Sequence, residues 1–225
     1  MKKVNAIPIN HPQRSEEWHQ ARLGYVTASM VKVLFEFNKN GTEKATRANY
    51  RKQKVAEIIY GMRVDEDKYV SQAMLWGQVS EDFAKTMYQV RTGQIINEAV
   101  FKKHPNIRCG ASADGLIGDR TTVEIKCLTP ANHVFNVMLD PQAVIGDYYD
   151  QIQMQMWIED REQCVFIGAD SRAPDGLKLY SEVIERDDKR IKQIEEAIIA
   201  FNAEVDRDVK KAFAVAKGYK EAGII

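Results

Sequence analysis

Long hydrophobic runs are absent from this chain of 225 residues. No apolar stretch approaches the roughly 20 residues that a transmembrane helix needs, so we expect no membrane association. The opening MKKVNAIPIN carries two lysines without an apolar block behind them, which is not the pattern of a secretory signal. With 44% hydrophobic residues, the chain can nevertheless build a sizeable core. We therefore expect a folded cytoplasmic protein.

The usual sequence motifs for zinc binding and for nucleotide-cofactor binding are also absent. The three cysteines are odd in number and form no C-x-x-C pair, so neither a disulfide framework nor a zinc knuckle is expected. The four histidines are scattered without metal-ligand spacing, and we interpret them as surface or core residues. No glycine-rich phosphate loop is present, which gives no support for ATP or NAD binding.

Net charge is zero, but it is unevenly distributed. Residues 1–54 contain 11 Lys and Arg against 4 acids, a net charge of +7, and the remainder carries −7. Such an asymmetry is compatible with a basic N-terminal part that faces phosphates, and also with an ordinary solvated surface.

Apolar periodicity divides the chain into a helical part and a sheet part. Ser15, followed by two acidic residues, is expected to cap the N-terminus of a helix. Gly24 and Gly93 are expected to end helices. The order of elements predicts an α/β (α+β) fold with a central mixed β-sheet flanked by helices. We expect one domain over residues 1–225. Its expected parts are helices over residues 15–93, strands near 95–103, 108–117, 122–127, 163–170 and 177–184 with a helix near 147–160 among them (a sheet core over 95–185), and a C-terminal helix over 188–216.

Chemistry is expected at the stretch SADGLIGDRTTVEIKC, which reads as a β-hairpin around the turn IGDR. Glu124 and Lys126 share one face of the second strand, and Asp114 falls opposite Glu124 across the hairpin. Taken alone, E-I-K is most simply a solvated strand. Together with Asp114, the two carboxylates and the main-chain carbonyl of Ile125 can bind one divalent cation such as Mg²⁺. Lys126 can then orient or deprotonate a water bound to that cation and offset phosphate charge.

The spacing Asp-x9-Glu-x-Lys resembles the PD-(D/E)XK nuclease motif, with Ala113 where that superfamily often has proline. Five blocks, two of which contain this motif, resemble in their order and spacing the lambda-type phage exonuclease or YqaJ-like viral recombinase family. These blocks are WHQARLGYVTAS (18–29), LWGQVSE (75–81), SADGL (112–116), EIKC (124–127) and YYDQIQMQMW (148–157), and VIERDDK (183–189) extends the likeness.

The resemblance implies a role for each matching residue. Asp114 and Glu124 would bind metal and Lys126 would be the catalytic lysine, while Glu81 would serve a second metal ion. Gln151 would orient the attacking water or hold the lysine. The alternative for Glu81 is a solvent-facing helix residue, and for Gln151 the polar face of an amphipathic helix. The pocket for a terminal 5′-phosphate would consist of Arg22, Ser29 and Ser112, residue types that suit a phosphate site.

The resemblance further implies a Mg²⁺-dependent 5′→3′ exonuclease with two ions, for which Mn²⁺ can substitute. Such enzymes digest linear double-stranded DNA from 5′-phosphorylated ends and leave 3′ single strands for a single-strand annealing protein. A homotrimeric ring around DNA, and a phage or prophage origin with action in the bacterial host cytoplasm, belong to the same expectation.

Two alternatives stay open at this stage. One is a structure- or sequence-specific DNA endonuclease of the same fold, which would cut circular duplex. The other is a nuclease-dead DNA-binding protein, which would be expected to lack one of the catalytic residues. The chain has all five of them, namely Glu81, Asp114, Glu124, Lys126 and Gln151.

Overall fold

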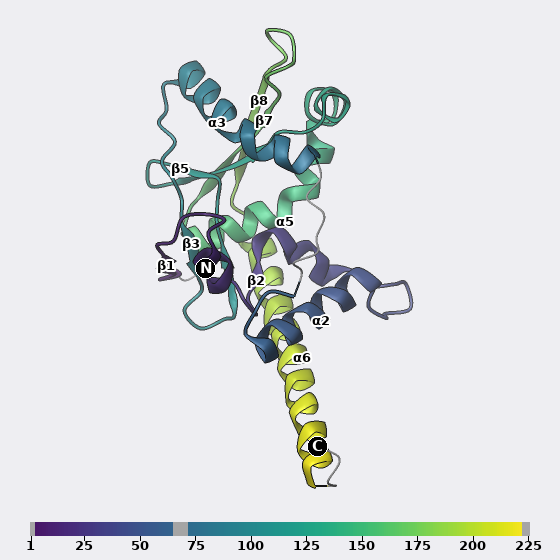
Figure 1. Cartoon of the computed structure of the whole chain (residues 1–225). Helices are drawn as coiled ribbons and strands as arrows, with labels where there is room; N and C mark the ends of the chain where they lie inside the picture. Colours follow the sequence, from purple (N-terminus) through teal and green to yellow (C-terminus); the bar gives the residue numbers. More distant parts are fainter. Residues whose placement is uncertain (1–2, 65–71, 222–225) are drawn as a thin grey trace.

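The chain folds into two small mixed sheets with helices packed between and around them (Figure 1). This computed structural model describes residues 3–64 and 72–221, apart from the side chains of 72–75, 77–79, 219 and 221. The elements are β1 (Ile7–Ile9), α1 (Glu16–Ala21), β2 (Val26–Thr27), the 3₁₀-helix η1 (Ala28–Phe35), α2 (Ala45–Tyr60), α3 (Gln72–Thr92), β3 (Phe101–Lys103), β4 (Cys109–Ala111), β5 (Gly115–Ile117), β6 (Thr121–Lys126), α4 (Pro130–Asn132), the π-helix η2 (His133–Leu139), α5 (Pro141–Glu159), β7 (Gln163–Ala169), β8 (Leu179–Glu185) and α6 (Asp188–Glu221).

The strands form two sheets rather than the one central sheet that the sequence predicts. One sheet has the order β1-β3-β4-β2 and the other the order β5-β6-β7-β8. The strand expected over 108–117 is therefore divided, because β4 pairs in parallel with β2 whereas β5 pairs antiparallel with β6. The chain passes from one sheet to the other through residues 112–114. The mixed α/β class is confirmed, and the division of the sheet is a correction.

Helix α5 lies between the two sheets, and its second half (residues 152–159) is buried on all sides. Met154 and Trp157 pack toward β2, β4 and α6, whereas Ile152 and Met156 pack toward β7 and β8. The opposite face of the second sheet packs against α3 through Val123, Ile125 and the α3 residues Ala84 and Tyr88. The predicted burial of Ile152, Met156 and Trp157 is confirmed, at 0%, 0% and 1% exposure.

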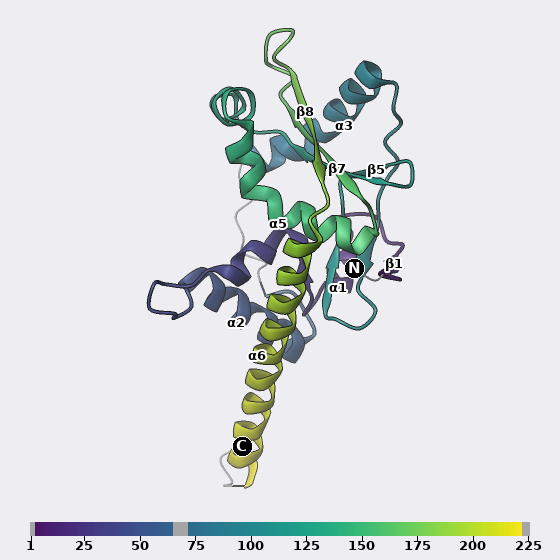
Figure 2. The same cartoon turned by 180° about the vertical axis from the view of Figure 1, so that it is seen from behind.

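Helix α6 begins against the body of the protein and then projects from it, as both views show (Figures 1 and 2). Its buried stripe matches the sequence prediction at Ile191, Ile194, Ile198, Phe201 and Val205. Full burial of each such side chain contributes about 1.5–3 kcal/mol.

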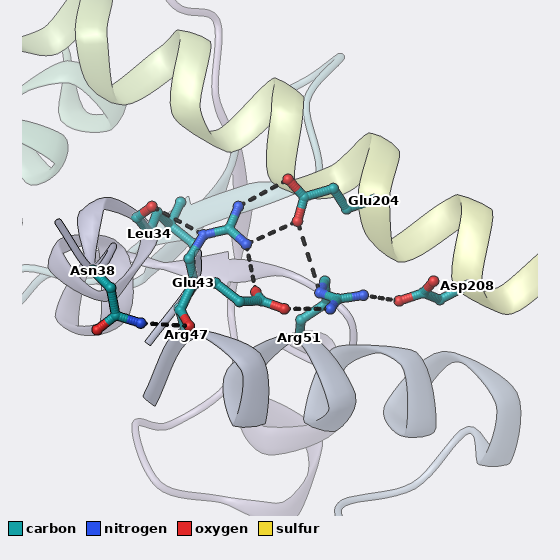
Figure 3. A network of polar contacts seen from close by, with 7 residues as sticks. All are labelled: Leu34, Asn38, Glu43, Arg47, Arg51, Glu204 and Asp208. Atoms are coloured by element: carbon teal, nitrogen blue, oxygen red, sulfur yellow. Dashed lines mark hydrogen bonds and ion pairs between the residues drawn. The ribbon is translucent and has the colours of Figure 1, made fainter. Parts of the chain in front are cut away.

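An ionic network joins α6 to α2 (Figure 3). Arg47 is buried and donates to the carbonyl of Leu34 at 3.1 Å and to Glu204 through both terminal nitrogens at 2.9 Å. Arg51, more exposed, pairs with Glu43 and Asp208. This network fixes α6 across the N-terminal helices.

Predictions of helix ends that depend on residues close together in the chain are confirmed. Ser15 caps α1 by accepting the amide N–H of Trp18 at 3.2 Å, and Gly93 ends α3 in the left-handed region. The strand expected from residue 95 begins only at Phe101, and the connecting segment after β6 contains η2 and the first turn of α5. None of the helices in the described ranges combines the length and the hydropathy of a membrane span. The single-domain organisation stays a prediction.

Candidate active site

The hairpin of β5 and β6 has the predicted register. Gly115 pairs with Val123, so Asp114 and Glu124 fall opposite each other just beyond the ladder. The amide N–H of Asp114 donates to the carbonyl of Val123 at 3.0 Å. Its carboxylate Oδ2 in turn accepts the N–H of Ile125 at 2.7 Å. Asp114 is therefore held at the strand edge from both its backbone and its side chain.

Ile125 presents its main chain to the same edge. In an extended strand the N–H and C=O of one residue point to the same side, and the N–H of Ile125 points to Asp114. Its carbonyl is thus directed past the end of β5, next to the carboxylate. The side chain of Ile125 meanwhile packs in the core beneath α3.

Glu124 faces α5 and is completely buried, contrary to the picture of a solvated strand. Its two carboxylate oxygens accept separate amides, Nε2 of Gln151 at 2.6 Å on Oε1 and Nε2 of Gln155 at 2.7 Å on Oε2. The ammonium of Lys126 lies 2.5 Å from Oε1. A buried charge persists only when it is paired and hydrogen-bonded, and these three partners meet that need.

Lys126 lies between the acids and an aromatic ring. Its Nζ stands 4.2 Å from the ring centroid of Tyr148. Burial works to lower the pKa of Lys126, but the charges of Glu124 and Asp114 outweigh it and the pKa is raised. The side chain is therefore an ammonium, suited to donating hydrogen bonds and offsetting negative charge rather than to accepting a proton.

Asp114 has the opposite electrostatic character. Burial and then the neighbouring charge of Glu124 raise the pKa of Asp114 to about 8, against the smaller opposing effects of Lys126 and the Ile125 N–H. Two carboxylates that share a site resist ionising together, and a cation between them relieves that repulsion.

Glu81 comes from α3 and completes the acidic group. Its charge contributes to the raised pKa of Asp114. Its carboxylate Oε1 accepts a hydrogen bond from Nη2 of Arg14 at 3.0 Å, and its side chain is 22% exposed. Glu81 is therefore not the isolated surface residue of the alternative interpretation.

The three residues expected to bind a phosphate line one cavity of about 150 Å³, together with Asp114 and Gln151. Arg22 follows α1 and stacks its guanidinium 3.8 Å from the Trp18 ring centroid. Ser29 belongs to η1, and Ser112 lies in the link between β4 and β5. The full lining is Gln13, Trp18, Arg22, Thr27, Ala28, Ser29, Phe101, Ala111, Ser112, Asp114 and Gln151.

The donor set fits a hard divalent cation. Within the described part of the chain, no three His, Cys, Asp or Glu side chains form a ready-made metal cluster. Two carboxylates and the Ile125 carbonyl supply only oxygen, which Mg²⁺ and Mn²⁺ prefer, and water completes such sites. Burial and Glu124 raise the pKa of Asp114, and a cation bound there would stabilise its ionised form.

Sequence reasoning missed three side chains of the site. Gln155 lies one helical turn after Gln151, and this i, i+4 spacing was the signal that both amides reach the same carboxylate. Gln13 and Arg14 come from the loop before α1, and no local pattern connects them with Ser112 and Glu81.

The fold and this site together define a deoxyribonuclease of the PD-(D/E)XK type. A sequence model of the YqaJ-like viral recombinase domain matches residues 17–162. The chain belongs to the YqaJ-like viral recombinase domain family, a family of exonucleases connected with phage recombination. Nucleases of this kind generally use divalent metal ions and act on DNA ends.

Solved structures support that assignment. An alkaline exonuclease from Laribacter hongkongensis is 34% identical with a TM-score of 0.80, covering 91% of this chain and 99% of that one. Its complex with dAMP gives the same identity and coverage with a TM-score of 0.81. A phage-related exonuclease from Haemophilus somnus 129PT shares the fold at 16% identity, with a TM-score of 0.68 and coverage of 84% and 96%. A comparison with curated protein sequences finds no significant match.

Proposed function

We propose that this protein is a Mg²⁺-dependent 5′→3′ exonuclease that digests linear double-stranded DNA from 5′-phosphorylated ends. The observation that carries the proposal is the cavity shared by Arg22, Ser29 and Ser112 with Asp114 and Gln151. A terminal phosphate held by the first three residues places the next phosphodiester toward the acids. That arrangement favours cleavage counted from a 5′ end over cleavage within a strand.

The chain's own residues divide the work of hydrolysis. Asp114, Glu124 and the carbonyl of Ile125 would hold one cation, and Glu81 would serve a second. Divalent cations held by these residues would supply an activated water and offset the charge of the phosphate. Lys126 donates from its ammonium to the attacking water or to a phosphate oxygen. Gln151 and Gln155 keep Glu124 oriented while water is largely excluded around it.

The polarity is tested on linear duplexes that carry 5′-phosphate or 5′-hydroxyl ends, with Mg²⁺ or EDTA. We expect fast digestion only of 5′-phosphorylated duplex in Mg²⁺, and at least a 100-fold loss in Asp114→Ala, by analogy with removal of other catalytic charge stabilisers. Equal digestion by Asp114→Ala would contradict the metal assignment. Equal digestion of 5′-phosphate and 5′-hydroxyl ends by the wild type would contradict the phosphate pocket of Arg22, and digestion from 3′ ends would contradict the polarity.

Circular duplex DNA separates this proposal from the endonuclease alternative. An exonuclease leaves a closed circle intact, whereas an endonuclease of the same fold linearises it. The 3′ single strands left by digestion would serve a single-strand annealing protein, and we propose a homotrimeric ring as the working assembly. Mass measurement in solution and pull-down with the annealing protein test those two points.

A further inference from the structure

The loop before α1 runs beside the acidic group. Gln13 lines the phosphate-side cavity and also a second hollow of about 460 Å³, and Asp114 lines both as well. The Nε2 of Gln13 lies 3.4 Å from Oγ of Ser112. This loop therefore lies where the two hollows meet, beside the position proposed for the scissile phosphate.

Arg14, the next residue, has a backbone conformation that suits glycine. Its φ is +72°, and in the described ranges the only other non-glycine residue with positive φ is Asp160, at +55°. A side chain in this region costs on the order of 1 kcal/mol, since the Cβ crowds the backbone. The turn is fixed by its neighbours, because Ser15 donates its N–H to the Pro12 carbonyl at 3.0 Å and caps α1. Folding alone would be served better by glycine.

The side chain of Arg14 is held in place and yet open to solvent. One of its five N–H groups donates to Glu81 at 3.0 Å, while 44% of the side chain is exposed. A carboxylate that fixes an arginine in this way reduces the conformational entropy lost when its remaining donors bind a ligand. The ligand suited to a planar guanidinium fork is a phosphate.

We infer that Arg14 binds a backbone phosphate of the DNA next to the scissile bond, preorganised by Glu81. The inference rests on the function proposed above and adds to it a binding residue outside the phosphate pocket. Arg14 supplies a cation at the edge of the acidic group, on the loop where the two hollows meet. The strained backbone is then the cost of placing an arginine where the substrate passes.

The test compares Arg14→Gly and Arg14→Lys with the matched control Asp160→Gly, which relieves the same kind of strain away from the site. Affinity for a 5′-phosphorylated linear duplex is measured by fluorescence anisotropy in EDTA over a salt series, with thermal unfolding in parallel. The KM and kcat in Mg²⁺, and the Mg²⁺ concentration that gives half-maximal activity (the Mg²⁺ midpoint), are further measurements for each variant.

For Arg14→Gly we expect about tenfold weaker binding, the size of one charge-assisted hydrogen bond, and a salt slope smaller by about 0.9. Its unfolding temperature should not fall, because glycine accepts the conformation. Arg14→Lys should keep the salt slope but lose several-fold in affinity, since it retains the charge without the fork. Asp160→Gly should bind DNA like the wild type.

Two results would overturn the inference while leaving the proposed function intact. One is Arg14→Gly with wild-type affinity and salt slope. The other is an unchanged slope with a shifted Mg²⁺ midpoint, which would mean that Arg14 serves Glu81 alone. Failure of the wild type itself to bind and digest linear duplex would overturn the proposed function, and the role of Arg14 with it.

Discussion

The amide of Gln155 connects the two halves of the candidate site: it donates to Glu124 Oε2 at 2.7 Å and to the carbonyl of Ser112 at 3.2 Å. Glu124 belongs to the acidic group, and Ser112 to the phosphate cavity. A single side chain from α5 thus fixes the position of both.

Substitution of Gln155 by leucine should therefore affect both stability and activity. It leaves a buried carboxylate oxygen without its donor, a loss of about 1–3 kcal/mol in the free energy of unfolding. We expect a lower unfolding temperature and a kcat reduced by about tenfold or more on 5′-phosphorylated duplex. Gln142→Ala, whose amide bonds Glu182 at the surface, is the control and should change neither. Wild-type kcat in Gln155→Leu would show that Glu124 needs no second amide.

Gly115 is the residue through which packing controls the position of Asp114. A Cβ at this position would stand 2.3 Å from Cγ2 of Ile96, so Gly115→Ala must push β5 away from its neighbour. Overpacking of this kind costs about 1–3 kcal/mol, and the shift should lower activity by displacing the adjacent carboxylate.

Two further variants serve as controls for Gly115→Ala. The double variant Ile96→Ala/Gly115→Ala removes the clashing methyl group and should recover part of the lost activity, measured as kcat/KM. Gly146→Ala, in helix α5 with open space around the added Cβ, should leave the activity unchanged. Full activity in Gly115→Ala alone would mean that β5 adapts without moving Asp114.

The stability that the ionic network between α2 and α6 provides should depend more on Arg47 than on Arg51. The Arg47 side chain is 5% exposed and that of Arg51 is 25% exposed. Arg47→Ala removes a buried partner of Glu204 and should cost about 3 kcal/mol, whereas Arg51→Ala should cost about 1 kcal/mol. Urea unfolding gives both values, and equal losses would contradict this ranking.

His104 should make stability depend on pH below neutrality. Burial lowers the pKa of His104 from 6.5, and its Nδ1 accepts the backbone N–H of Ile107 at 3.0 Å. The unfolded chain therefore binds the proton more readily than the folded one. The contribution of neutral His104 to the free energy of unfolding is fully present above about pH 6.5 and is lost as the pH falls below it. His104→Asn keeps an acceptor without titrating, so its unfolding temperature should fall less between pH 7 and pH 5. Identical curves would exclude this histidine.

The sequence predicted those parts of the molecule that depend on neighbours in the chain. The cap at Ser15, the hairpin register that places Asp114 opposite Glu124, and the apolar stripe of α6 all follow from local periodicity. The roles of Arg22 and Ser29 could not be derived from local pattern. They entered through the family resemblance, and the shared cavity supports them.

What the sequence did not predict depends on contacts between distant segments. The division of residues 108–117 follows from the pairing of β4 with β2, whose residues lie more than 80 positions earlier. The burial of Glu124 requires α5 to lie across β6, and an E-I-K pattern reads the same whether or not a helix covers it. The Arg14–Glu81 bond spans 67 positions.

The passage of the chain between the two sheets has a consequence for the length of the product. Ser112 lies at the phosphate cavity and Asp114 at the acids, only two residues apart, so their Cα atoms are separated by at most roughly 7 Å. Because the chain connects these two residues directly, a relative movement of the two sheets cannot lengthen the distance between them. For the function proposed above, each catalytic cycle would measure off one nucleotide, and the released unit would be a mononucleotide.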